Sequence, residues 1–148
     1  MNNTSQIVAQ FCRFHPLSLR TLQRVVAYAR IAEICSPAPV LVPFIVCLSI
    51  MKVLSPDLYD MARNGTLIQS TVFDNLFRFV DWRDEYDSAK RTLISERVEE
   101  LWHYALGSLK DKQKIQQIET SFAEHAFSTP KNIIAYCCDL LDGFSLPG

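Results

Sequence analysis

Residues 17–59 read LSLRTLQRVVAYARIAEICSPAPVLVPFIVCLSIMKVLSPDLY, and this stretch decides the fold class. Apolar residues recur every three or four positions in its first part, which predicts an amphipathic helix. Ser18 is expected to cap that helix, because its hydroxyl can accept a hydrogen bond from a free backbone N–H. The Ser-Pro-Ala-Pro run at residues 36–39 predicts where the helix ends.

Residues 40–54 are almost entirely apolar and predict a second, buried helix. Their β-branched side chains would also suit a buried strand, but strands usually span only about 4–8 residues. Pro43 is compatible with a helix only in its first turn. Ser55-Pro56-Asp57 then predicts a new helix, with serine as the cap and proline at the first position. Asn64-Gly65 is typical of a left-handed helix end.

The remaining patterns predict further helices. One spans residues 67–79, a long amphipathic one ends at Gly107, and a narrower, exposed one lies within residues 109–126. A last helix is expected to be capped at Thr129-Pro130 and to stop at Gly143. We therefore predict an all-α fold, an irregular multi-helix bundle of about six to eight helices. Residues 1–148 are expected to form a single helical domain, with two helical halves meeting near residues 80–88 as the alternative.

Composition limits the class of protein. The chain has 148 residues, of which 49% are hydrophobic and 21% charged, and its formal net charge is -1. These values are typical of a globular domain and exclude a disordered chain. A nearly neutral chain gives no global charge excess that would favour nucleic acid or an acidic membrane.

Cysteine usage and hydropathy bear on the compartment. The five cysteines are an odd number, and most lie in apolar surroundings, which favours free thiols in a reducing compartment. The N-terminus lacks the pattern of a signal peptide. The uncharged segment at residues 36–51 contains three prolines and is shorter than the roughly 20 residues of a membrane-spanning helix. We expect a cytoplasmic chain with no membrane span.

Few residues suggest chemistry. Cys12 and His15 have the spacing of half a metal site, but no second pair follows. Cys137, Cys138 and His103 have no neighbouring partner that would suggest nucleophilic catalysis. The acidic run at residues 81–87 is expected to be a solvated charge cluster that contains Asp81, Asp84, Glu85 and Asp87. The isolated glycines exclude a phosphate-binding loop. We therefore expect no catalytic residue, no metal and no cofactor of the chain's own.

The N-terminal arginines are more informative. Residues 1–35 contain four arginines and one glutamate, a local charge of +3 in a nearly neutral chain; they are Arg13, Arg20, Arg24, Arg30 and Glu33. Arg20 and Arg24 are four residues apart and share one helix face. Guanidinium groups can bind phosphate oxygens in bidentate fashion. These arginines are therefore either a phosphate or nucleic-acid contact, or a solvated face that pairs with the acidic run.

Residues 14–79 resemble the C-terminal helical part of the KAP family of P-loop NTPases. The resemblance is carried by LSLRTLQRVVAYARIA, LVPFIVCLSIMKVL and SPDLYDMARNGTL. In that family the corresponding region follows the P-loop domain, where related AAA-like ATPases have a helical lid with a nucleotide-sensing arginine. The resemblance implies that Arg20 is the first candidate for this sensor and Arg24 the second. It also implies a cytoplasmic, often membrane-associated NTPase, sometimes linked to phage exclusion in bacteria.

This sequence departs from the family because it lacks the Walker A and Walker B motifs and the membrane segments between them. We therefore expect a helical lid or interaction module that is not an enzyme on its own. Its expected partner is another protein or the missing NTPase domain. The alternative is a nucleic-acid-binding or regulatory helical module that uses the N-terminal arginines.

Overall fold

The structure is a computed structural model that describes residues 17–35, 41–67, 93–124 and 132–143. In these ranges the chain forms helices and no strands, which confirms the predicted all-α fold. The helices are α2 (Leu19–Cys35), α3 (Val42–Leu54), α4 (Pro56–Asn64), α6 (Leu93–Ala105), α7 (Lys112–Glu124) and α8 (Ile133–Asp142). The helix predicted at residues 67–79 and the boundary predicted near residues 80–88 lie outside the described residues.

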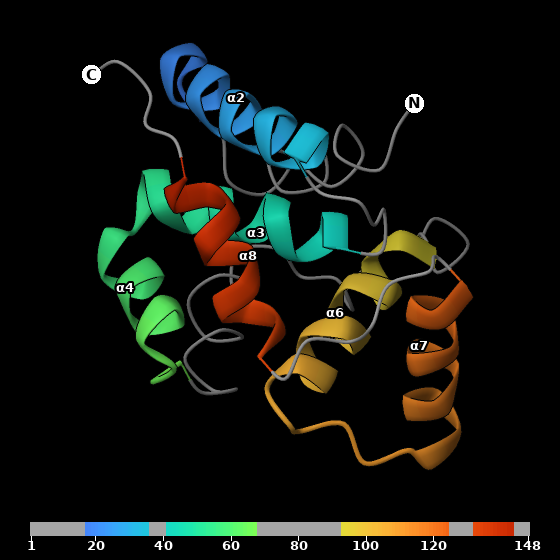
Figure 1. Cartoon of the computed structure of the whole chain (residues 1–148). Coiled ribbons are helices and arrows are strands. Elements are labelled where there is room, and N and C mark those ends of the chain that lie inside the picture. Colours follow the sequence, from blue (N-terminus) through green and yellow to red (C-terminus); the bar gives the residue numbers. More distant parts are fainter. Residues whose placement is uncertain (1–16, 36–40, 68–92, 125–131, 144–148) are drawn as a thin grey trace, which may run out of the picture.

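Helix α3 is the centre of the bundle (Figure 1). Every residue from Val42 to Met51 is buried, and α2, α4, α6 and α8 all pack against this helix. The hydroxyl of Ser49, a buried polar group, donates a hydrogen bond to the Ile45 carbonyl at 2.7 Å. The nearly uninterrupted apolar sequence is explained by this position, since α3 has packed neighbours on several sides.

The helical segments are short relative to a bilayer. With its 13 residues, α3 is about 20 Å long, whereas the hydrocarbon core is about 30 Å thick. Among the helices that the structure describes, none combines the length and the hydrophobicity that a membrane crossing requires.

Helices α6 and α7 extend the bundle on the side of α3 that lies away from α2 (Figure 1). The rings of Phe44 on α3 and Trp102 on α6 lie 5.4 Å apart between centroids. Helix α7 buries only a thin stripe that includes Ile118 and Phe122, as its sequence pattern predicts. The chain then returns, and α8 packs against α2, α3 and α4.

The sequence signals at the starts of α2 and α3 are confirmed. The Ser18 hydroxyl accepts a hydrogen bond from the Thr21 backbone N–H at 3.2 Å, and Pro43 lies in the first turn of α3. Ser55 is the N-cap residue of α4, but its side chain makes no capping hydrogen bond, so this part of the prediction is wrong. Ser55 is also the C-cap residue that follows α3, and its N–H donates to the Met51 carbonyl at 2.7 Å.

Helices α4, α6 and α8 end at or just before the glycines predicted to stop them. Gly65 and Gly107 have φ angles of 75° and 76°, the left-handed conformation expected at helix ends. Helix α8 also ends before Gly143, but this glycine has an ordinary φ of -68°. The N-cap of α8 is Asn132, whose side chain accepts a hydrogen bond from the Ala135 N–H at 3.1 Å. The cap predicted at Thr129-Pro130 lies outside the described residues, and Asn132 caps the described start of α8 instead.

Candidate functional site

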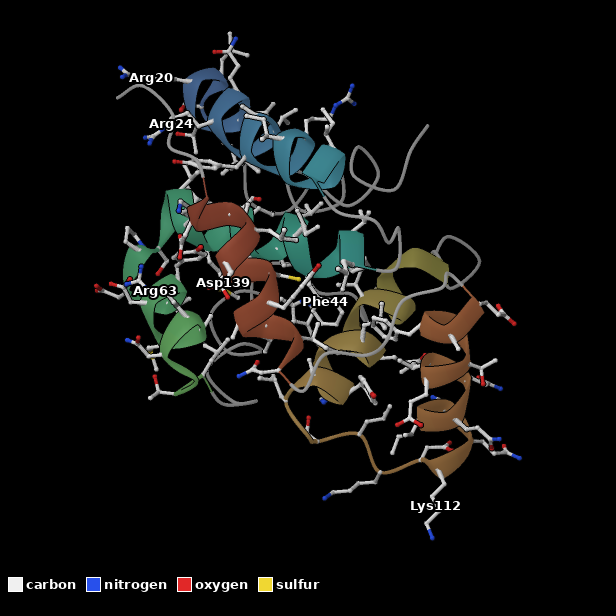
Figure 2. The ribbon with its side chains drawn as sticks, in the orientation of Figure 1. Arg20, Arg24, Phe44, Arg63, Lys112 and Asp139 are labelled. Atoms are coloured by element: carbon white, nitrogen blue, oxygen red, sulfur yellow. The ribbon has the colours of Figure 1, made fainter. Side chains whose placement is uncertain are left out.

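The two sequence-predicted arginines lie at the start of α2, and Figure 2 shows both side chains extending from the same side of this helix. Arg20 is exposed and Arg24 is half-buried. The Nε of Arg24 is buried and has no hydrogen-bond acceptor in the described part of the chain. A buried guanidinium N–H without an acceptor costs free energy, so Arg24 is the arginine whose surroundings favour an added acceptor.

The other N-terminal arginines do not complete this pair. Arg30 lies on α2 but ten residues after Arg20, which turns it roughly a quarter of a turn away around the helix axis. Arg13 and the acidic run at residues 81–87 lie outside the described residues. The structure thus brings Arg20 and Arg24 together and separates Arg30 from them.

A second polar group joins α3, α4 and α8. The Asp142 Oδ1 on α8 accepts hydrogen bonds from the Lys52 Nζ on α3 at 2.8 Å and from the Tyr59 hydroxyl on α4 at 2.7 Å. The same hydroxyl lies 3.3 Å from the Cys138 carbonyl oxygen. The other carboxylate oxygen of Asp142 is 3.8 Å from an Arg63 nitrogen. We call Lys52, Tyr59 and Asp142 the polar joint.

Two tyrosine rings complete the surroundings of the lysine. The Lys52 ammonium lies 4.8 Å from the Tyr59 ring centroid and 5.2 Å from that of Tyr28 on α2. These cation–π contacts stabilise the charge where its side chain is only 20% exposed. The polar joint therefore connects four helices through one ammonium group.

The pKa shifts at the polar joint follow from these contacts. Burial raises the pKa of Tyr59 far above its ordinary value, and the hydrogen bond to Asp142 raises it further, so the hydroxyl remains a donor. Burial alone would raise the pKa of Asp142, but hydrogen bonds from Lys52 and Tyr59 and the charges of Lys52 and Arg63 outweigh it and lower that pKa. The carboxylate is thus ionised and held by donors, which is the chemistry of a structural contact.

Cys47, Cys137 and Cys138 are buried free thiols. Burial raises the pKa of Cys47 to about 12, against a smaller lowering by the Trp102 indole N–H. That indole nitrogen is buried, and its contact with the sulfur falls short of hydrogen-bond geometry. Burial likewise raises the pKa of Cys138 to about 11 and that of Cys137 further. These thiols are protonated at neutral pH, and a protonated thiol is a poor nucleophile and metal ligand.

The remaining candidates are accounted for as follows. The Nδ1 of His103 lies 2.8 Å from the Ser108 hydroxyl, just after the end of α6. Cys12 and His15 lie outside the described residues. In the ranges that the structure describes, no three His, Cys, Asp or Glu side chains lie close enough to share a metal ion.

An open polar hollow of about 490 Å³ runs along α7. Its described lining residues are Gln113, Gln116, Gln117, Thr120, Ser121 and Glu124. All of them belong to one helix, on the side opposite the buried stripe. The described residues therefore provide only one wall of this hollow, remote from the arginines of α2.

Sequence reasoning found the arginine pair and missed the polar joint. Arg20 and Arg24 are neighbours along one helix, so their spacing reveals them. Lys52 and Asp142 are 90 residues apart, and their pairing depends on how α8 packs. The one available signal was Lys52 itself, a charged side chain at the end of a long apolar run.

Comparison with family models, with curated proteins and with solved structures finds no match to this chain.

Proposed function

We propose that this chain is a helical lid or interaction module, not catalytic on its own, that acts with an NTPase domain lying outside these residues. Arg20 and Arg24 would contact the phosphates of the nucleotide that this domain binds. The proposal combines the resemblance of residues 14–79 to the helical part of KAP-type NTPases with the position of the arginine pair.

The observation that carries the proposal is the environment of Arg24. Its Nε is buried without an acceptor in the described part of the chain, while Arg20 is exposed one turn earlier on the same side of α2. A phosphate approaching this side of the helix would supply an oxygen acceptor to the Arg24 guanidinium and would lie close to that of Arg20. Arginine suits this role because its planar donors match the geometry of phosphate oxygens.

The competing proposal is a nucleic-acid contact that uses the same arginines. A duplex is bound through several cationic groups that follow its phosphate backbone. Arg30 is turned away from Arg20 and Arg24, between the exposed apolar side chains of Leu19 and Ile34. This face lacks the row of cationic groups that a phosphate backbone requires, and we therefore favour the nucleotide-sensing role over a nucleic-acid contact.

The test adds the P-loop NTPase domain that would bind the nucleotide. A purified KAP-type P-loop NTPase domain without its own C-terminal helices is mixed with the full chain, and ATP hydrolysis is measured. We expect the wild-type chain to change the rate of ATP hydrolysis. The change caused by the double variant Arg20→Ala/Arg24→Ala should be at least about tenfold smaller, since arginines that contact a transferring phosphate contribute strongly to the rate of its transfer. Arg30→Ala is the matched control and should behave as the wild type.

Two results would contradict the proposal. One is a hydrolysis rate that does not respond to the chain, or that responds equally to the double variant. The other is micromolar ATP binding by the isolated chain in calorimetry, since a half-site should bind ATP very weakly. Salt-dependent DNA binding that is lost in the same double variant would favour the nucleic-acid alternative.

A further inference from the structure

One side of α2 carries large apolar side chains in solvent. Leu19 is 71% exposed and Ile34 is 83% exposed, although α2 buries Val25, Tyr28 and Ala29 on its opposite side. Between them, at steps of three or four residues, lie Gln23, Ala27 and Arg30. This spacing places all five residues along one face of the helix. We call Leu19, Gln23, Ala27, Arg30 and Ile34 the outer stripe.

The outer stripe has a symmetric order of side chains. An apolar residue stands at each end, a polar residue follows inward from each end, and the small Ala27 lies near the middle. The apolar ends are about 22 Å apart along the helix axis. A small residue at the centre allows two helices to approach closely there. Such an order is complementary to itself when reversed.

We propose that the outer stripe is a docking surface for a second copy of this chain, with the two α2 helices packed antiparallel about a twofold axis near Ala27. In this arrangement Leu19 contacts Ile34 of the partner subunit, and the same contact recurs on the other side of the axis. The Arg30 guanidinium donates to the side-chain oxygen of Gln23 of the partner subunit. Every polar and apolar member of the stripe thereby gains a matching neighbour.

Other arrangements fit the stripe less well. In a parallel twofold pair each residue faces its own copy, so the two Arg30 charges would repel each other. A membrane surface is favoured by a broad, continuous apolar face, whereas here Gln23 and Arg30 separate Leu19 from Ile34. Nucleic acid offers no apolar partner for these two side chains. The antiparallel pair is the arrangement that uses the whole stripe.

The proposed interface is small. A stripe of five residues covers less than the roughly 800 Å² per partner that a stable complex buries. We therefore expect a reversible dimer with a dissociation constant on the order of 100 µM. This inference goes beyond the proposed function, and its test involves no nucleotide, so either proposal can fail while the other stands.

The test is sedimentation equilibrium of the full chain between about 10 µM and about 1 mM, which brackets the expected constant. Wild-type chain should pass from monomer to dimer across this range. Ile34→Ser should weaken the dimer at least about tenfold, because two buried apolar contacts are lost per dimer. Its far-UV circular dichroism should be unchanged, since a side chain this exposed contributes little to folding.

A gain of affinity tests the geometry. Gln23→Glu places a carboxylate opposite Arg30 of the partner subunit twice per dimer and should tighten it about fivefold. Gln23→Arg should weaken it by a similar factor. Gln116→Glu, the same change on the exposed face of α7, is the control and should have no effect. In a parallel pair Gln23→Glu would instead bring two carboxylates together and weaken the dimer.

Three outcomes would overturn the proposal. These are a chain that stays monomeric up to about 1 mM, well above the expected constant, a dimer that Ile34→Ser leaves intact, and a dimer that Gln23→Glu weakens. The last outcome would indicate a parallel pair or a different face.

Discussion

Asp142 is the residue on which three helices depend, because one of its oxygens accepts hydrogen bonds from both Lys52 and Tyr59. We expect Asp142→Asn to lower the free energy of unfolding by about 1–2 kcal/mol, since the amide can still accept a hydrogen bond but removes the negative charge that pairs with the largely buried Lys52. Urea denaturation at neutral pH measures this change. Asp60→Asn is the control: Asp60 pairs with Arg63 at the surface and is 53% exposed, so its loss should stay within about 0.5 kcal/mol.

The effect of Asp142 should depend on pH with a definite sign. Its pKa is lowered in the folded protein, so the unfolded chain binds a proton more readily in acid. The stabilisation is thus present above the ordinary pKa of 3.8 and is lost as pH falls through the lower, folded-state value. Wild type and Asp142→Asn should therefore converge in stability at strongly acidic pH. A gap that stays constant down to the acid limit would show that the carboxylate charge is not the cause.

At the scale of single elements, the end of α4 can be tested directly. Gly65 has a φ of 75°, and its N–H and that of Thr66 donate to the Ala62 and Met61 carbonyls at 3.2 and 2.9 Å. A Cβ at Gly65 would meet no atom within 4 Å, so the cost of Gly65→Ala is that of the left-handed backbone alone. We expect a loss of about 1–2 kcal/mol in the free energy of unfolding by urea.

Gly143→Ala is the matched control at the end of α8. Gly143 has a φ of -68°, which alanine adopts readily, and a Cβ there would lie 3.4 Å from the Leu140 carbonyl oxygen. Its effect should remain within about 0.5 kcal/mol. Equal losses for the two variants would mean that backbone conformation does not determine the difference.

These two glycines also illustrate how far the sequence alone could go. Both follow a helix, and the pattern predicts both helix ends correctly, but of the two only Gly65 is left-handed. Likewise Ser18 caps through its side chain, as predicted, while Ser55 does not, because this one residue both ends α3 and starts α4. Local signals locate helix boundaries well. The hydrogen bonds made there depend on the neighbouring helix.

The candidate site shows the same difference between contacts within one helix and contacts between helices. Arg20 and Arg24 could be predicted as a pair, because one helical turn brings them together. Lys52, Tyr59 and Asp142 could not, because their contact requires α8 to return across the sequence to α3 and α4. The burial of the Arg24 Nε could not be predicted from the sequence either, since burial depends on how the helices pack and not on the spacing of residues.

At the scale of the whole molecule, Phe44 and Trp102 connect α3, in the first half of the chain, with α6, in the second half. Their rings lie 5.4 Å apart, and both side chains are fully buried. If this contact makes the helices one cooperative unit, weakening it should destabilise all of them together. We expect Phe44→Leu to lower the free energy of unfolding by about 1–2 kcal/mol.

The measurement uses two probes in a Trp82→Phe background, which leaves Trp102 as the sole indole. Far-UV circular dichroism reports all helices, and Trp102 fluorescence reports the contact between α3 and α6. Both transitions should shift to the same lower urea concentration, as expected of two-state unfolding. Leu54→Ala, at a partly exposed position on the same helix, serves as the control and should shift both less. Two separate transitions would instead divide the chain into independent helical halves, because Trp102 would then lose its environment while α2, α3 and α4 remained folded.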